Sequence, residues 1–471
     1  MDGSWDQLMR LLSNRGLEWL RQRIMALPDP CPLDHPDIGA LALVGQIAPV
    51  LSGLRGRISP IEVIVLRRLT PDLVRQGALR VLDGARDDAL VRLTLAGGLV
   101  AQTDPLWQLA CEALADDPAL PLPHRLALSD DPVLLAQAEA VLTMPPTSIT
   151  PDHVAQVAQL LMQLYHHGAR RPRLSHPRAY TLIFDHLRML ATWAQGAGCT
   201  GSVARIAFCL RLLDDDHPVA DMLSDLIQVQ RPDGSFPVRL GFATADQTFA
   251  DAVQPTVHVA MALHMAAWKR WRGPAPVWLQ PHPVQATARQ LADRIAAMDI
   301  PNAQALHAAT SLTRATGENW FARLCPARQA VPDDLTRLGR ICFRDAVAAR
   351  HLRAWLGLTR HGDRPSGLDG PEAAWLTGRI VAIATPLPDA VMRLWDRAAL
   401  AGDVAAFTDC ARIAQHHADG PASPAVRAMT RRLCVEALTQ DAPLSRMLDS
   451  LDRLTLLSRL FEPEAKAAAA A

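Results

Sequence analysis

A polar residue followed directly by proline recurs along much of the chain, and this dipeptide is typical of helix N-termini. Such pairs occur at Ser59-Pro60, Thr70-Pro71, Asp104-Pro105, Asp117-Pro118, Asp131-Pro132, Thr150-Pro151, Thr385-Pro386 and Ser423-Pro424. Proline at the first helical position loses no hydrogen bond, and the preceding Ser, Thr or Asp can accept one from a later backbone N–H. Between these starts apolar residues recur at helical spacing, and strand-like alternation is hard to find. We therefore predict an all-α chain of helical hairpins with roughly seventeen to nineteen helices.

Two segments concentrate residues that cannot continue a helix, and they suggest domain boundaries. The first is Met144-Pro145-Pro146-Thr147-Ser148, and the second covers residues 272–283. Four His-Pro pairs are interpreted in the same way, as starts of further helices. The predicted parts are an N-terminal helical array (1–145), a central unit (146–275), a C-terminal helical array (276–462) and a disordered or tag-like tail (463–471).

Charge and hydropathy exclude some classes of protein. Lys+Arg and Asp+Glu are both 48, which argues against a domain that binds nucleic acid through its phosphates. Two segments without charge, Ile38–Leu54 and Ala252–Trp268, approach the shortest length of a membrane span, but proline and polar residues interrupt both. We predict that they are buried helices and that no helix spans a membrane. The eight cysteines are scattered, and the N-terminus lacks the features of a secretory signal, so we expect a cytoplasmic protein.

One stretch carries a recognisable motif. Residues Gln230-x-x-Asp233-Gly234-Ser235-Phe236 follow a predicted helix, and Gln254-Pro255-Thr256 opens the apolar segment after them. A glycine here allows a tight turn with positive φ, the Phe236 ring can stack on a neighbouring helix, and the Gln230 amide can bond exposed groups at a helix end. The motif resembles the glutamine–tryptophan repeat of the terpenoid cyclase and protein prenyltransferase superfamily, with Phe236 in place of tryptophan.

The resemblance implies an α/α toroid, in which an outer ring of helices surrounds an inner ring of apolar helices. Residues 146–275 would be the toroid-like unit, and Ala252–Trp268 would be one of its inner helices. The superfamily's Asp-x-Asp-Asp, Asp-Asp-x-x-Asp and zinc-binding motifs are not matched. The resemblance therefore favours a fold and leaves open whether the chain is an enzyme.

Polar residues in the loop and first turn before the apolar helix lie where the mouth of a cavity is expected. The predicted catalytic residues are Asp233, Asp251 and His258, and the predicted substrate-binding residues are Arg239, Asp246, Gln254, Met261, His264 and Trp268. Structural alternatives stay open for several of them. Asp251 can simply cap the helix with Arg239 as its salt-bridge partner, and His264 can be a core histidine.

Other motifs have structural interpretations that we prefer. Asp214-Asp215-Asp216-His217 with Asp221 is suited to helix capping, and Cys31 with His35 lacks a second ligand pair. We therefore assign no metal ligands from the sequence, and the cofactor stays open. Gly196-x-Gly198-x-x-Gly201 follows a helical pattern where a dinucleotide site needs a strand. We interpret it as a helix C-terminus followed by a new N-cap at Ser202.

Two functional hypotheses follow. In the first, the chain is a toroid-like protein of a specialised biosynthetic pathway that binds a lipophilic or peptide-like molecule in an apolar cavity, with or without catalysis. In the second, it is a non-catalytic helical scaffold or adaptor for a partner enzyme, since helical arrays present concave surfaces to other proteins.

Overall fold

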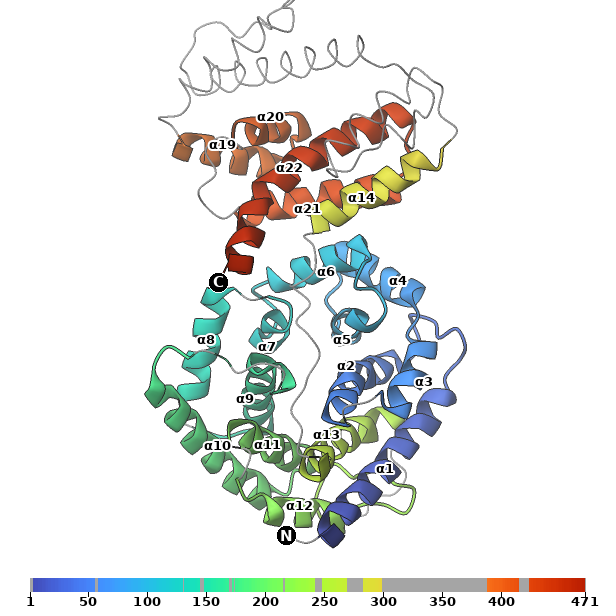
Figure 1. Cartoon of the computed structure of the whole chain (residues 1–471), viewed down its shortest axis with the longest axis vertical. Coiled ribbons are helices and arrows are strands. Elements are labelled where there is room, and N and C mark those ends of the chain that lie inside the picture. Colours follow the sequence, from blue (N-terminus) through green and yellow to red (C-terminus); the bar gives the residue numbers. More distant parts are fainter. Residues whose placement is uncertain are drawn as a thin grey trace, which may run out of the picture. The chain divides into compact units, whose positions relative to one another are not determined.

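The computed structural model is helical in every part that it describes (Figure 1). Those residues are 3–55, 58–129, 131–144, 148–168, 172, 174–214, 217–241, 248–268, 283–298, 388–414 and 423–470. They contain eighteen α-helices, two short 3₁₀ helices (η1 and η2) and no β-strand. The prediction of an all-α chain is therefore confirmed.

The chain divides into two compact units, which we call unit 1 (Met1–Gln280) and unit 2 (Pro281–Ala471). The helices of unit 1 are α1 (Gly3–Met25), α2 (Ile38–Arg55), α3 (Pro60–Arg68), α4 (Pro71–Leu82), α5 (Asp88–Ala96), η1 (Gly97–Leu99), α6 (Pro105–Ala115), α7 (Leu122–Leu126), α8 (Pro132–Thr143), α9 (Pro151–Leu164), η2 (His166–Gly168), α10 (Pro177–Ala197), α11 (Thr200–Leu213), α12 (Ala220–Gln228) and α13 (Phe249–Trp268). Those of unit 2 are α14 (Pro283–Ala296), α19 (Pro388–Ala401), α20 (Val404–Ala414), α21 (Pro424–Thr439) and α22 (Leu444–Ala470). The predicted boundary near residue 276 lies close to the division between the units, the one at 145 lies within unit 1, and α22 includes most of the predicted tail.

Most of the polar–proline pairs start helices as predicted. Helices α3, α4, α6, α8, α9 and α21 begin at the proline, and the preceding Ser, Thr or Asp side chain accepts a hydrogen bond from a backbone N–H two or three residues later. Asp117-Pro118 is an exception, because α7 begins only at Leu122. Pro121 and Pro123 lack the N–H groups that a helix started at Pro118 would need. Thr385-Pro386 lies outside the described residues.

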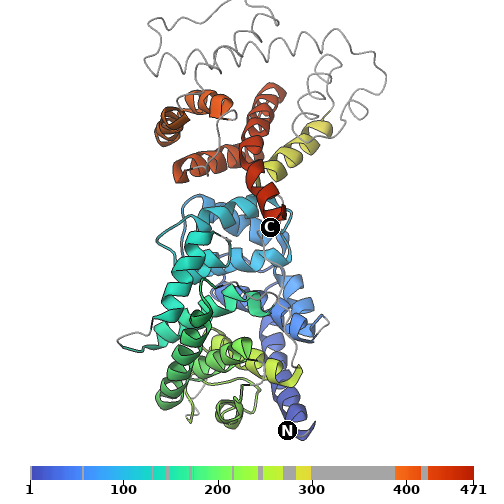
Figure 2. The same cartoon turned by 60° about the vertical axis from the view of Figure 1, so that its left-hand side comes forward.

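The helix contacts of unit 1 form a closed circuit (Figures 1 and 2). Helix α13 packs on α2, α2 on α5, α5 on α6, α6 on α7, α7 on α9, α9 on α11, and α11 on α13 again. Helices α1, α3, α4, α8, α10 and α12 contact members of this circuit and lie at its periphery in Figure 1. The charge-free segments Ile38–Leu54 and Ala252–Trp268 fall in α2 and α13, and both are largely buried as predicted. None of the described helices is long and apolar enough to span a membrane.

The turn around Gly234 docks on α1 and brings the two ends of unit 1 together. Gly234 has φ +97°, which confirms the predicted tight turn. Gln230 Nε2 donates to the carbonyl oxygens of Leu12 (2.9 Å) and Gly234 (3.0 Å), so its partner is a carbonyl inside α1 rather than a group at a helix end. Phe236 is fully buried, and its backbone N–H donates to Thr256 Oγ1 on α13 (3.0 Å). The turn therefore joins α1 to α13.

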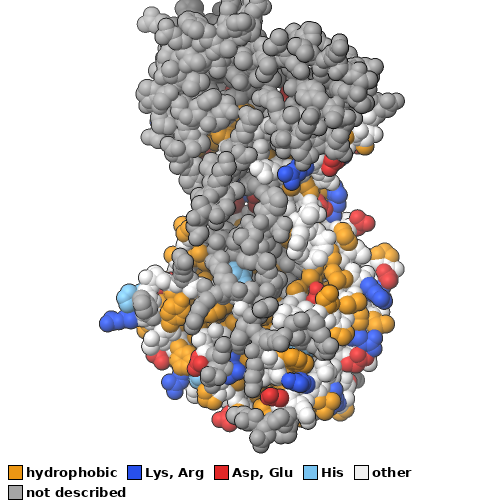
Figure 3. Space-filling model, viewed as in Figure 1, with side chains coloured by type: hydrophobic (Ala, Val, Ile, Leu, Met, Phe, Trp, Pro, Cys, Tyr) orange, Lys and Arg blue, Asp and Glu red, His pale blue; other side chains and the backbone are white. Residues whose placement is uncertain are grey.

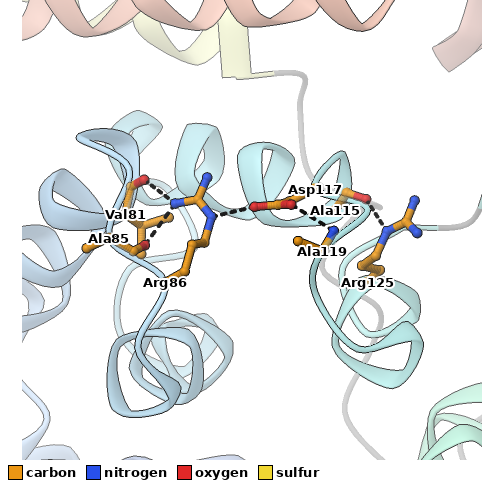
Figure 4. Close-up of polar contacts among 7 residues, drawn as sticks. All are labelled: Val81, Ala85, Arg86, Ala115, Asp117, Ala119 and Arg125. Atoms are coloured by element: carbon orange, nitrogen blue, oxygen red, sulfur yellow. Dashed lines mark hydrogen bonds and ion pairs between the residues drawn. The ribbon is translucent and has the colours of Figure 1, made fainter.

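A polar cluster holds the ends of α4 and α6 together beside α7 (Figure 4). Arg86 Nε donates to Asp117 Oδ2 (2.6 Å), and Arg86 Nη1 donates to the carbonyls of Val81 (2.7 Å) and Ala85 (2.8 Å). Arg125 Nε donates to the Ala115 carbonyl (3.0 Å) at the end of α6. Val81 and Ala115 lie in the last turns of α4 and α6, where carbonyl groups have no partner within the helix.

Unit 2 is a helical bundle in the part that is described. Helix α14 packs on α21 and α22, and α19 packs on α20 and α21. Its core includes Trp395 and Phe407, whose ring centroids are 5.5 Å apart. Arg294 Nη1 donates to the carbonyls of Ala437 and Leu438 at the end of α21.

Candidate functional site

The predicted site residues outside the helices have local structural roles. Asp233 Oδ1 accepts hydrogen bonds from the backbone N–H (2.9 Å) and the hydroxyl (2.7 Å) of Ser235, which stabilises the turn around Gly234. Arg239 is exposed and pairs with Cys199 through its backbone. Asp246 lies outside the described residues.

Asp251 completes the N-terminal cap of α13. Thr248 Oγ1 donates to Asp251 Oδ2 (2.6 Å), and the Asp251 backbone N–H donates to Thr248 Oγ1 (3.3 Å). This reciprocal arrangement resembles a capping box. It starts α13 at Phe249, three residues before Ala252, where the predicted inner helix begins, and it agrees with a capping role for Asp251.

The remaining predicted residues divide between two sides of α13. His264 and Trp268 lie on the side that meets α1: His264 contacts Ser13 Oγ and stacks on the Trp268 ring at 4.4 Å, and the Arg10 guanidinium lies over that ring at 5.4 Å. Met261 is fully buried in the core.

Gln254 and His258 are one turn apart, and the charge of Arg205 on α11 acts on His258. The structure therefore leaves His258 as the buried polar residue of the predicted catalytic set.

Arg205 is the main feature of this region that sequence reasoning missed. It belongs to α11, in which every residue from Ser202 to Leu210 is buried, and the arginine itself is only 5% exposed. Its Nε and Nη2 atoms have no hydrogen-bond partner in the described part of the chain. These two nitrogens form one edge of the guanidinium group, and that edge matches two oxygens of a carboxylate or phosphate.

No group in the described part of the chain neutralises the charge of Arg205. The ionisable groups that act on it are Arg92, which is a second cation, and the thiols of Cys199 and Cys209, and no carboxylate is among them within the described residues. Burial lowers the pKa of Arg205 to about 10, so the side chain stays cationic at neutral pH. A buried charge without a partner costs several kcal/mol. The site is therefore suited to an anion that supplies the missing oxygens.

The charge of Arg205 acts on His258, which is neutral. Burial lowers the pKa of His258 well below its ordinary value, and the charges of Arg205, Arg92 and His167 lower it further. Its Nδ1 is 2.7 Å from the Gln254 carbonyl, which assigns the proton of the neutral ring to Nδ1. The lone pair is then on Nε2, which can accept a hydrogen bond from a ligand.

His167 comes from a strained segment after α9. His166, His167 and Gly168 have φ values of 44°, 50° and 97°, a conformation that is unusual for residues other than glycine. Burial lowers the pKa of His167 to about 4. Such strain persists only where surrounding contacts impose it, and it is frequent at functional sites.

Two further basic residues, Arg92 and His124, lie on α5 and α7. Arg92 forms an ion pair with Asp88 (2.6 Å), and its carbonyl accepts a hydrogen bond from Gln46 on α2 (2.8 Å). The Nδ1 atom of His124 is buried without a partner among the described residues, and burial lowers the pKa of this imidazole. We call Arg205, His258, His167, Arg92 and His124 the basic cluster.

Two interpretations of other motifs can now be compared with the structure. Gly198 ends α10 with φ 64°, as predicted, but α11 begins at Thr200 with Cys199 as its N-cap, so the predicted N-cap at Ser202 is wrong. Ser202 Oγ donates to Cys199 Sγ (3.1 Å), which secures the start of α11. No group of three His, Cys, Asp or Glu side chains that could hold a metal occurs within the ranges that the structure describes.

The described face in Figure 3 shows acidic and basic side chains of unit 1 interspersed over its surface. Within the basic cluster, Arg205 and His258 are buried, whereas Arg92, His124 and His167 are half-buried. A comparison of the chain with protein-family models, with curated proteins and with solved structures gives no match.

Proposed function

We propose that unit 1 binds a lipophilic molecule that carries a carboxylate or phosphate group. Arg205 would hold the anionic group through its Nε and Nη2 atoms, inside an α/α-toroid-like ring formed by the closed circuit of helices. The observation that carries the proposal is the buried edge of the Arg205 guanidinium, which has no protein partner in the described residues. Two parallel charge-assisted hydrogen bonds to one anion would satisfy both nitrogens.

The lipophilic character of the ligand follows from the helices around the basic cluster. α2, α11 and α13 are apolar on nearly all sides, and their contacts join them in the circuit. This composition agrees with the inner ring that the resemblance to terpenoid cyclases implies. In a specialised biosynthetic pathway, such a molecule would be a substrate or an intermediate.

If the bound molecule is a substrate, His258 is the residue that would act as the general base. In its neutral form Nε2 accepts a proton or a hydrogen bond, and general bases act through such a nitrogen. Asp233 and Asp251 bond to their own turn and cap, so we do not include them in the proposed machinery.

The test measures binding of four small probes to the full-length chain. Decanoate and decyl phosphate carry both the apolar chain and the anion, decanol carries only the chain, and inorganic phosphate carries only the anion. We expect the first two to raise the melting temperature and to give saturable heats in titration calorimetry, because ligands that bind the folded state stabilise it. Decanol and phosphate should bind at least about tenfold more weakly.

Substitution at Arg205 completes the test. Arg205→Met should abolish binding of both anionic probes, whereas Arg80→Met, at an exposed arginine on α4, should leave it unchanged. If decanol bound as tightly as decanoate, or if Arg205→Met bound decanoate normally, the anion site would be refuted. Failure of every probe to bind would instead favour the scaffold hypothesis.

A further inference from the structure

A pair of histidines joins two helices of unit 1 away from the basic cluster. His153 lies in the first turn of α9, and His186 lies in the middle of α10. Their Nε2 atoms are 3.4 Å apart, and their rings are tilted by 31°. His186 is buried and His153 is half-buried.

The second nitrogen of His186 is held by the neighbouring helix. His186 Nδ1 lies 2.9 Å from the Leu142 carbonyl in the last turn of α8. A carbonyl only accepts hydrogen bonds, so this contact assigns the proton of neutral His186 to Nδ1 and leaves a lone pair on Nε2. That lone pair points to the side where His153 lies. A backbone carbonyl on the second nitrogen is one of the common partners of a metal-binding histidine, beside carboxylates and water.

The separation of the two Nε2 atoms matches two ligands of one zinc ion. Zinc–imidazole bonds are about 2.0–2.1 Å long, and a tetrahedral angle between two of them puts the nitrogens about 3.3–3.4 Å apart. A square-planar ion with bonds of the same length needs a separation of only about 2.9 Å. For an N–H···N hydrogen bond between the two rings, 3.4 Å is at the long end of the range.

We propose that His153 and His186 form a zinc-binding site that clamps α9 to α10. No third His, Cys, Asp or Glu joins the pair among the described residues, so water or a small anion would complete the tetrahedron. The Leu142 carbonyl would orient His186, and the clamp would thereby connect α8, α9 and α10, which pack on one another in unit 1 (Figure 1). This site is independent of the proposed anion site.

The test uses the full-length chain after treatment with a chelator. Titration calorimetry with zinc chloride should show one site, and the protein should melt at a higher temperature with zinc than without it. His153→Gln should lower the affinity about tenfold or more, because one of two protein ligands is lost. The matched control is His176→Asn on the same helix as His186, because asparagine keeps the N-cap role of this exposed histidine.

Cobalt gives a spectroscopic readout that a purely structural histidine pair would not produce. Cobalt bound to the wild-type chain should give the intense visible bands of a tetrahedral ion. His153→Cys keeps a metal ligand while it removes the imidazole, and cobalt bound to it should add a thiolate charge-transfer band. The proposal would be overturned by the absence of zinc binding, by unchanged affinity in His153→Gln, by an octahedral cobalt spectrum, or by the absence of the thiolate band.

Discussion

Gly234 lies so close to Arg15 that a side chain at position 234 would collide with the α1 backbone. A Cβ atom built on Gly234 would be 2.5 Å from the Arg15 carbonyl oxygen and 2.9 Å from its carbonyl carbon. The Arg15 side chain in turn donates to the Pro232 carbonyl (2.8 Å), so the turn and the helix hold each other. The glycine is therefore required twice, for its φ of +97° and for this close approach.

Gly234→Ala should destabilise unit 1 by about 2–4 kcal/mol, since the substitution adds backbone strain to a steric clash. Urea denaturation followed by circular dichroism measures the effect. Gly196→Ala is the control, because a Cβ at this position of α10 meets nothing within 4 Å and the substitution should be neutral or stabilising by up to about 1 kcal/mol. Equal stabilities of the two variants would show that the turn does not dock on α1.

Local features of the fold could be predicted because their causes lie within a few residues. Thr70 and Thr150 each cap the helix that starts at the next residue, so the Thr-Pro dipeptide alone is enough to predict where the helix begins. The turn at Gly234 is also local. The contact between Gln230 and Leu12 joins residues 218 positions apart, and no local pattern specifies which carbonyl the amide meets.

The candidate site was harder to predict for the same reason. The sequence shows that Arg205 interrupts an apolar run, but an arginine on a helix often extends its charge to solvent along an apolar surface. Only the packing of α13 against α11 shows that His258 and Arg205 lie near each other in the interior. His258 was predicted from its place on the apolar helix, whereas His264, on the next stripe of the same helix, faces α1.

We expect substitutions of Arg86 and Asp117 to lower the stability of the protein by unequal amounts. Asp117→Asn should cost about 0.5–1 kcal/mol, because the ion pair is partly exposed to water. Arg86→Met should cost more, because it also removes the donors to the Val81 and Ala85 carbonyls (Figure 4). Chemical denaturation of both variants and of the double variant measures the coupling. If the two single variants lost the same stability, the carbonyl contacts would contribute nothing.

The buried histidines predict that stability falls on mild acidification. Burial lowers the pKa of both His258 and His167, the latter to about 4, whereas histidines of the unfolded chain keep the ordinary value of 6.5. The unfolded chain thus binds more protons in this range, and stability is lost as the pH falls from about 7 through 6.5 toward 4. The Arg86 hydrogen bond lowers the pKa of Asp117, so this carboxylate loses its contribution only near and below pH 3.8.

Urea denaturation at several pH values between 7.5 and 5 tests this prediction. His258→Gln should flatten the dependence of stability on pH whatever its effect at pH 7.5, because it removes one of the groups that gain a proton on unfolding. Arg80→Met, at an exposed position, leaves every histidine in place and should keep the wild-type slope. A variant at His258 with an unchanged slope would mean that this imidazole titrates normally in the folded protein.

We expect Arg205 to lower the stability of the protein without ligand and to provide the binding of an anionic ligand. In the ligand-free protein its cationic side chain is buried and its Nε and Nη2 atoms lack protein partners among the described residues, so Arg205→Met should raise the free energy of unfolding by about 1–3 kcal/mol. Most substitutions in a core have the opposite sign. The exposed control Arg80→Met should stay within about 0.5 kcal/mol of the wild type.

With saturating decanoate the wild type should become more stable than Arg205→Met, since the wild type alone gains stability from the ligand. A loss of stability in ligand-free Arg205→Met would mean that the guanidinium is already satisfied within the protein, and the need for an anion would disappear.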